Sequence, residues 1–360
     1  IGFNAMYNAD NRSSGRFVYS VAIGHSALRG SSTPANNTGR FNTAVGYETM
    51  YDNSSGDDNS AFGYHALKNN TTGDQNTAIG VEALLTNESG LRNTACGYQS
   101  LYSNESGATE NTAVGYQSMR TNTTGFQNSA FGTEALFSNN TGKENTAVGY
   151  HTLRANTNGY GNTANGYMAL YQSDVADYNT SNGFKSLYSA TNGQYNSANG
   201  SEALYYNITG DYNTASGYKA LYNSTADNNV GFGSSSGYTI TTGSNNTFIG
   251  TYADASSNNL TNATAIGFDA EVNASNKVVI GNSSVGIIGG YAAWSNYSDK
   301  RLKENIIYKS DLGLDFISRL KTVSYNYKDD KNKRRRDGLI AQDVQQVLDE
   351  LGLEFSGLII

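Results

Sequence analysis

A short internal repeat dominates the sequence and limits its possible folds more than any other feature. Each unit begins Asn-(Ser/Thr)-Ala-x-Gly-Tyr and continues into a polar stretch that ends in a second Gly. From Gly46 to Gly267 the first glycines of successive units, here called anchor glycines, are 16 to 18 residues apart, and most steps are 17. The anchor glycines are Gly2, Gly24, Gly46, Gly63, Gly80, Gly97, Gly115, Gly132, Gly149, Gly166, Gly183, Gly200, Gly217, Gly233, Gly250, Gly267 and Gly281.

This spacing predicts β-structure, because a helical-hairpin repeat needs roughly 33 residues or more. β-branched and aromatic residues cluster around each anchor, and strand side chains alternate between two faces. Thr43, Val45 and Tyr47 therefore share one face, whereas Ala44 and Gly46 share the other. We interpret each unit as one coil of a parallel β-solenoid whose coils advance by about 4.8 Å. Contacts between neighbouring coils, and lateral association of chains, are expected to stabilise it.

Two further columns recur through most of the repeat. An apolar residue lies four positions after the anchor, and a second Gly lies ten positions after it in many coils, where we expect it to supply a positive φ at a turn. The apolar column is Met50, Leu67, Leu84, Leu101, Met119, Leu136, Leu153, Leu170, Leu187, Leu204 and Leu221, and the turn glycines include Gly56, Gly73, Gly90, Gly107, Gly125 and Gly142.

Charge divides the chain into two parts. Of 24 basic and 31 acidic residues, 12 and 11 lie in the last 63 positions. We therefore predict a mainly β protein with a repeat shaft over residues 1–290, a linker over 291–297 and a small α+β domain over 298–360. A single Cys and three His argue against a disulfide framework and a metal site, so no metal or cofactor is expected. No stretch approaches the ~20 apolar residues of a membrane span.

The shaft repeat resembles the head repeats of trimeric autotransporter adhesins, most closely in Ala263–Gly267 and Lys277–Gly281, and its 17-residue form resembles repeats of phage tail fibres. The resemblance implies a left-handed β-roll and a homotrimer.

The segment Ser298–Ile306 resembles the opening of the intramolecular chaperone domain of phage tailspikes, also called the S74 peptidase domain, and Gly338–Val344 matches its second signature. In that family the domain brings three chains into register and is then released by cleavage. The resemblance implies that the bond between Ser298 and Asp299 is cut, with Ser298 as nucleophile and Lys303 as general base. A desolvated Lys can take the hydroxyl proton. The family's domain continues into a C-terminal helix, so we expect the domain to be truncated at Ile360.

The residues themselves also predict a small α+β unit in this segment. Asp311 is expected to cap a helix whose apolar residues are Leu312, Phe316, Ile317 and Leu320. Strands are predicted over 322–327 and 338–341. Val344, Val347, Leu348 and Leu351 have helical spacing.

From residue 165 onward, the position before the anchor changes from apolar to polar. This polar column is Asn165, Asn182, Asn199 and Ser216, in place of residues such as Val45, Phe62 and Ile79. One interpretation is a stack of Asn amides inside a core, bridging strands or chains around water or ions. The other is a column that faces solvent.

Several single residues are open to a structural and a functional interpretation. We interpret Cys96 as core filler, the three histidines His25, His65 and His151 as surface residues, and the Tyr column after the anchor as packing between coils, with a carbohydrate-stacking surface as the alternative. The glycosylation sequons are better explained by turn chemistry. They begin at Asn53, Asn70, Asn87, Asn104 and Asn122. The basic run 331–336 is interpreted as a solvated hairpin loop, so no nucleic-acid partner is expected.

Together these features favour a trimeric virion fibre, a phage tail fibre that reaches a host-surface receptor and contacts other tail proteins. The receptor would be a glycan or an outer-surface protein. A bacterial trimeric surface adhesin, located at the cell surface, is the first alternative. A tailspike glycan depolymerase is the second, although it needs a carboxylate-bearing cleft and no acidic column recurs. The only catalysis expected is one self-cleavage event, with no turnover enzyme in the repeat region.

Overall fold

A computed structural model of the chain describes residues 1–8, 19–105, 107–289, 313–326 and 335–352. The chain divides into two compact units, residues 1–287 and 288–360. The first is a β-solenoid and the second contains both sheet and helix, so the mainly β fold class is confirmed. Within the described ranges, no helix has the length and apolar character needed to cross a bilayer.

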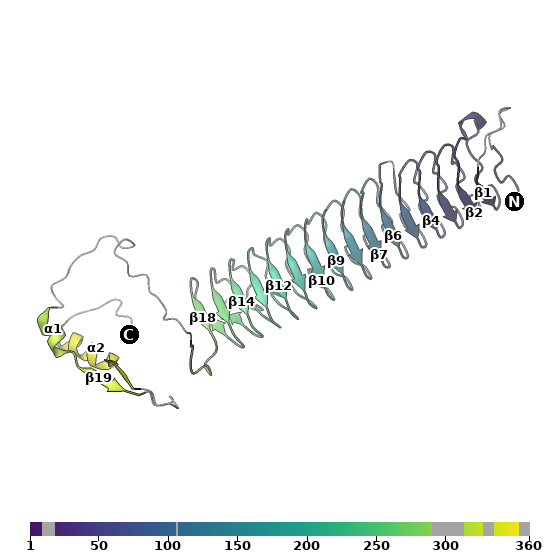
Figure 1. The fold of residues 1–360 in the computed structure, drawn as a ribbon. Coiled ribbons are helices and arrows are strands. Elements are labelled where there is room, and N and C mark those ends of the chain that lie inside the picture. The colour runs from purple at the N-terminus through teal and green to yellow at the C-terminus, as the bar shows by residue number, and fades with distance from the viewer. Residues whose placement is uncertain (9–18, 106, 290–312, 327–334, 353–360) are drawn as a thin grey trace. The chain divides into compact units, whose positions relative to one another are not determined.

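Sixteen strands of the described chain form one parallel sheet, in which each strand pairs with the next one in the solenoid (Figure 1). The spacing of these strands confirms the parallel β-solenoid of about 17-residue coils. The strands are β1 (Val21–Ile23), β2 (Thr43–Val45), β3 (Ser60–Phe62), β4 (Thr77–Ile79), β5 (Thr94–Cys96), β6 (Thr112–Val114), β7 (Ser129–Phe131), β8 (Thr146–Val148), β9 (Thr163–Asn165), β10 (Thr180–Asn182), β11 (Ser197–Asn199), β12 (Thr214–Ser216), β13 (Val230–Phe232), β14 (Thr247–Ile249), β16 (Thr264–Ile266) and β18 (Val278–Ile280).

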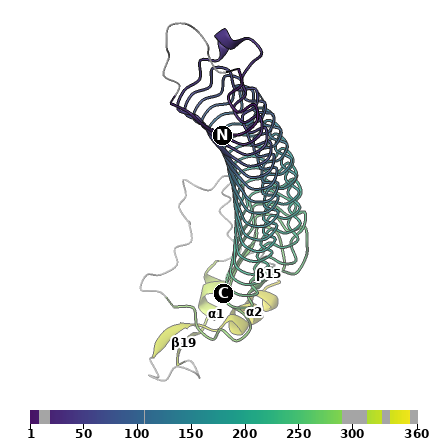
Figure 2. The same ribbon diagram turned by 90° about the vertical axis from the view of Figure 1, so that its right-hand side faces the viewer.

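Two short elements lie outside this sheet in the first unit. A 3₁₀ turn, η1 (Pro34–Asn36), occupies the long step between the second and third anchors. Strands β15 (Asp254–Ala255) and β17 (Glu271–Val272) form a separate parallel pair at the end of the solenoid. Figure 2 shows the successive coils as nested loops of similar outline.

Most strands place small residues inside the coil and large ones outside; β14, with the fully buried Phe248, is an exception. In β2 the side chain of Ala44 is fully buried, whereas Thr43 and Val45 are half-buried on the opposite face. The register aligns like with like, so that Ala44 pairs with Ala61 and Val45 with Phe62. The predicted sharing of faces is therefore correct, and the coil interior is so narrow that Ala fills it at this position.

Steric contact between coils explains the anchor glycines. Gly132 has a φ of 139°, and a Cβ on this residue would lie 2.2 Å from the carbonyl oxygen of Gly149 in the next coil. Neither the backbone angle nor the spacing admits an L side chain. The same geometry recurs from coil to coil, which is why the anchor is the most regular feature of the sequence.

The second glycine has a different role from the one predicted in most coils. Gly107 has the positive φ expected at a turn, 95°, but Gly125 does not, and neither do Gly56, Gly73, Gly90 and Gly142. A Cβ on Gly125 would lie 2.4 Å from both the Gly142 carbonyl oxygen and the Asn122 side-chain oxygen. Close packing therefore demands glycine here, since two coils and a buried amide meet at this point.

Residues with a left-handed backbone conformation form the corner after each anchor. Ala66 and Leu67 are adjacent in sequence and both are fully buried, which a regular strand does not allow. His65 has a φ of 55° and Leu67 a φ of 53°, and this alternation turns both neighbouring side chains inward. The predicted apolar column is confirmed as core, because every member from Met50 to Leu221 has no exposed surface.

Two ladders of buried asparagines run along the solenoid interior. The first consists of the asparagines that precede each strand, such as Asn111, Asn128 and Asn145. The Asn128 side-chain oxygen accepts from the Asn145 backbone N–H at 3.0 Å, and its Nδ2 donates to the Gly142 carbonyl at 2.8 Å. Each coil thus presents the acceptor that the next coil needs, and the buried polar groups are satisfied.

The second ladder is formed by the sequon asparagines and continues to Asn156. In this ladder each Nδ2 donates to the side-chain oxygen of the preceding coil at 2.7–3.0 Å. The ladder stops where Ser173 replaces Asn. The Asn156 side-chain oxygen and the Ser173 hydroxyl are buried there without a hydrogen-bond partner.

The second unit is small. Helix α1 (Leu314–Arg319) is followed by strand β19 (Thr322–Tyr325), strand β20 (Arg336–Leu339) and helix α2 (Ala341–Glu350). The two strands pair antiparallel with Thr322 opposite Leu339. Most of the basic run, residues 331–334, lies outside the described residues. The predicted helices and strands are present within two or three residues of the expected bounds. Gly313 begins α1 without a side-chain cap, and Asp311, the predicted cap, lies outside the described residues.

Candidate functional site

The residues predicted to cut the chain, Ser298, Asp299 and Lys303, lie outside the part of the chain that the structure describes. Their roles as nucleophile, scissile bond and general base therefore stay predictions. The second signature, Gly338–Val344, lies within the described residues.

This signature spans the end of β20 and the start of α2. Gly338 lies in β20, where a Cβ would be at 3.5 Å from the ring of Tyr325, an ordinary contact. Ile340 precedes the first residue of the helix and has an extended backbone. Val344 lies in the first turn and is buried. The signature thus fixes a strand-to-helix turn and directs Val344 into the core.

The core of the second unit is formed where α1 and α2 meet. Phe316 from α1 packs with Val344, Val347 and Leu348 from α2, and Leu320 and Leu351 lie at its edge. Ile317, expected on the apolar face of the first helix, is 60% exposed instead. Helix α1 has six residues, which is less than two turns, so it packs against α2 mainly through the side chain of Phe316.

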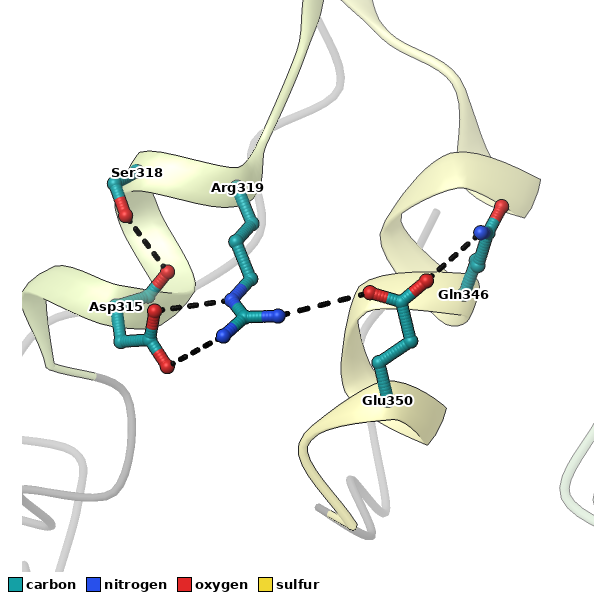
Figure 3. A network of polar contacts seen from close by, with 5 residues as sticks. All are labelled: Asp315, Ser318, Arg319, Gln346 and Glu350. Atoms are coloured by element: carbon teal, nitrogen blue, oxygen red, sulfur yellow. Dashed lines mark hydrogen bonds and ion pairs between the residues drawn. The ribbon is translucent and has the colours of Figure 1, made fainter.

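A polar network connects the same two helices on the surface (Figure 3). The Arg319 guanidinium donates two hydrogen bonds of 3.0 Å to the Asp315 carboxylate, and it lies 3.8 Å from a Glu350 oxygen on α2. Hydrogen bonding from Arg319 lowers the pKa of Asp315 below its usual value. The partners are exposed, so the network orients the helices more than it stabilises them.

Comparison with known families identifies this segment. Residues 298–353 match the Peptidase_S74 family, described as the chaperone of endosialidase. The C-terminal segment is a chaperone domain of this family. The match begins at Ser298. A search of curated proteins found no match to the chain.

The shaft that precedes the chaperone domain carries an exposed apolar column on its main sheet. This outer column is the residue before each anchor, and its members stack through the parallel register. Eight of them are large, apolar and 38–46% exposed. They are Ile23, Phe62, Ile79, Phe131, Val148, Phe232, Ile249 and Ile280. Exposed apolar side chains that gather in this way typically mark an interaction surface.

The polar residues Asn165, Asn182, Asn199 and Ser216 continue this outer column. They face away from the interior of their own coil, because the middle residue of each strand points inward. Asn182 donates from Nδ2 to the Asn199 side-chain oxygen at 2.9 Å, so two amides bridge neighbouring strands on the surface. The column does not lie in the core of the single chain.

Cys96 belongs to the same outer column, which corrects its interpretation as core filler. Its side chain is half-buried on the outward face of β5. The strand alternation had placed it correctly beside Val45 and Ile79, but that face points away from the coil interior.

The histidines His65 and His151 are also less exposed than predicted. The His65 Nε2 lies 3.1 Å from the Glu48 carboxylate, and the same carboxylate is 2.7 Å from the Lys68 ammonium. Burial, with the nearby Lys68 charge, lowers the pKa of His65. Among the residues that the structure describes, no group of three His, Cys, Asp or Glu could hold a metal ion.

The tyrosines after the anchor stack between coils, as predicted. Their rings pack face to face with centroids 5.2–5.5 Å apart. Where two rings adjoin, each covers a face of the other, but these side chains keep 42–49% of their surface exposed, so a carbohydrate-stacking surface stays the alternative. The sequon asparagines are buried, with 0–4% exposed surface, which confirms the turn explanation over glycosylation.

Sequence reasoning missed a hollow at the chaperone-proximal end of the shaft. It has a volume of about 610 Å³ and is lined by Tyr238, Tyr252, Asp254, Asp269 and Glu271, among others. The signal for it was present in the sequence. Asp254 and Glu271 lie four residues after the anchors Gly250 and Gly267, at the position where the coils from Met50 to Leu221 have Leu or Met.

Three donors hold the Asp254 carboxylate at the wall of this hollow. They are the Thr239 hydroxyl at 2.7 Å, the Thr239 N–H at 3.1 Å and its neighbour's N–H, that of Ala255, at 2.8 Å. Burial raises the pKa of Asp254, whereas these hydrogen bonds oppose the shift. Asp254 is also the register partner of Glu271, so two carboxylates face outward side by side.

Proposed function

We propose that this chain is the shaft and assembly domain of a virion fibre, a phage tail fibre that attaches to a host surface. The observation that carries the proposal is the order of its parts. A long parallel β-solenoid is followed in the sequence by a chaperone domain of the Peptidase_S74 family. Parallel in-register coils are non-local across chains and slow to nucleate, so a fibre of this kind benefits from a domain that sets the register.

The outer apolar column supports assembly as a homotrimer. Its stripe of Ile, Val and Phe side chains runs along the sheet and is not covered by the chain itself. Identical chains in the same register would place like residues opposite one another and bury this stripe, at about 25 cal/mol per Å² of apolar surface. In such a trimer Asn165, Asn182, Asn199 and Ser216 would face the neighbouring chains.

The chaperone domain is proposed to leave the fibre by self-cleavage between Ser298 and Asp299. In this proposal Lys303 accepts the proton of the Ser298 hydroxyl, which is otherwise a weak nucleophile. The match to the family begins at Ser298 itself, which supports this position for the cut.

Expression of the full chain tests both parts of the proposal. Intact-mass measurement should find two fragments divided after Ser298, and light scattering should give the mass of three shaft fragments. Ser298→Ala and Lys303→Met should each abolish cleavage, whereas Lys321→Met should leave it unchanged. Cleavage that persists in Ser298→Ala, or a shaft with the mass of one chain, would contradict the corresponding part.

A further inference from the structure

The hollow between Tyr238 and Glu271 forms because two surface columns of the shaft change in the last coils. In earlier coils the groove between the second and fifth positions after the anchor is filled by side chains that bridge it. Examples are the ion pair of Glu48 with Lys68 at 2.7 Å and that of Glu134 with Arg154 at 2.6 Å.

Rings fill the same fifth position further along. Tyr171, Tyr188, Tyr205, Tyr222 and Tyr238 stack with centroids 5.0–5.5 Å apart. The next residue in this column is Ala255, which lies in β15 with only 3% of its surface exposed. The ring ladder therefore ends at Tyr238, and its last ring has a face that no further ring covers in the described chain.

The hollow also has an uncompensated negative charge. Asp254, Asp269 and Glu271 line it, and none of the ion pairs found in the described ranges involves them. Tyr252 stands beside the carboxylates with 54% of its surface exposed. A ligand for this hollow must present an apolar face to a tyrosine ring and positive charge or hydroxyl donors to carboxylates.

We propose that this hollow binds an amino sugar, with the C–H face of its ring against Tyr238 and its ammonium group facing Asp254 and Glu271. The apolar face of a pyranose packs on an aromatic ring through dispersion and the release of water. Ammonium is attracted by carboxylates and by the negative face of a tyrosine ring. Acidic sugars are excluded because three carboxylates repel them. The volume of about 610 Å³ lies within the usual range of small-ligand sites.

Saturation-transfer NMR on the full chain tests the site with three probes at pH 6.5: methyl glucosaminide, methyl glucoside and methyl N-acetylglucosaminide. The glucosaminide should bind about tenfold more tightly than the two neutral sugars, and 1 M salt should weaken its binding. Equal binding of all three, or no transfer to the glucosaminide, would overturn the proposal.

Three variants locate the binding. Tyr238→Ala should weaken glucosaminide binding about tenfold, and the isosteric Glu271→Gln should weaken it about fivefold, with a control in Tyr188→Ala. Tyr188 has the same kind of ring, but Tyr171 and Tyr205 cover its two faces, so its removal should leave binding unchanged. If Glu271→Gln, a surface change that spares the fold, binds like the parent chain, the assignment fails.

The biological meaning of the site rests on the proposed attachment function, whereas sugar binding itself does not. A chain that binds the glucosaminide but does not adsorb to any host cell would refute attachment alone. A chain that adsorbs equally well with Tyr238→Ala and Glu271→Gln would refute the role of this hollow alone.

Discussion

Truncation of one buried amide, in the variant Asn128→Ala, should destabilise the shaft strongly. The Asn128 Nδ2 donates to the Asn111 side-chain oxygen at 3.1 Å and to the Gly142 carbonyl at 2.8 Å. Its side-chain oxygen accepts from the backbone N–H and the Nδ2 of Asn145 at 3.0 and 3.1 Å. The variant removes all four bonds, and the side chain that makes them has no exposed surface.

The partners differ in what they retain after truncation. The Asn111 oxygen still accepts from the Asn128 backbone N–H, and the Gly142 carbonyl still accepts from Asn139. The Asn145 Nδ2 keeps its bond to the Gly159 carbonyl. Only the Asn145 backbone N–H is left buried without an acceptor. The buried N–H without an acceptor costs about 1–3 kcal/mol, and the loss of the other hydrogen bonds adds to this. The free energy of unfolding should therefore fall by about 3–5 kcal/mol.

Denaturant unfolding followed by circular dichroism measures this loss, and hydrogen exchange at the Asn145 amide locates it. Asn140→Ala is the matched control, because Asn140 is exposed and has no side-chain bond in the described structure; its effect should stay within about 0.5 kcal/mol. If Asn128→Ala is no more destabilising than Asn140→Ala, the buried ladder does not stabilise the shaft and the reasoning is wrong.

Three further outcomes follow from the same coils. Gly132→Ala should cost at least about 3 kcal/mol, because its Cβ would meet the Gly149 carbonyl oxygen in a forbidden backbone region; a melting temperature unchanged from the parent would contradict this. Ser173→Asn should raise stability by about 1 kcal/mol in the same denaturant titration, since its Nδ2 can donate to the unpartnered Asn156 oxygen. The lowered pKa of His65 means that the unfolded chain takes up a proton more readily than the folded one, so stability present above about pH 6.5 is lost as pH falls. His65→Gln should therefore make stability less sensitive to pH between about 7 and 5, and an unchanged slope would show that another group is responsible.

The repeat allowed the coil, its strands and its buried Leu column to be predicted from sequence, because stacked identical units must bury like residues together. Alternation also showed correctly that Ala44 and Val45 lie on opposite faces. It did not show which face points inward. A face of small residues and a face of large apolar residues could each be the buried one. The narrow width of the coil places Ala inside at this position. Cys96 was wrongly interpreted as core filler for this reason, and two interpretations of Asn165 had to stay open.

The two glycine columns illustrate the same limit. Glycine was predicted at turns for its backbone freedom, yet Gly125 is required by the approach of a neighbouring coil, a contact between distant residues that local sequence does not display. The hollow beside Tyr238 was missed because it depends on β15 turning Ala255 inward. In the chaperone domain the short apolar patterns were sufficient for both helices. The cleavage residues are predicted only from the family signature.

The direction of the buried amides has a consequence for how such a shaft varies in length. In the sequon ladder each Nδ2 donates to the Asn of the coil on its N-terminal side, and each side-chain oxygen is placed to accept from the coil on its C-terminal side. Within this ladder the interface between any two coils is therefore equivalent to the next one, with the same donor and acceptor in the same places. Deletion or duplication of one whole repeat unit joins equivalent surfaces, so the length of the shaft can change in steps of one coil. Deletion of part of a unit would instead misalign the donors and acceptors at the junction.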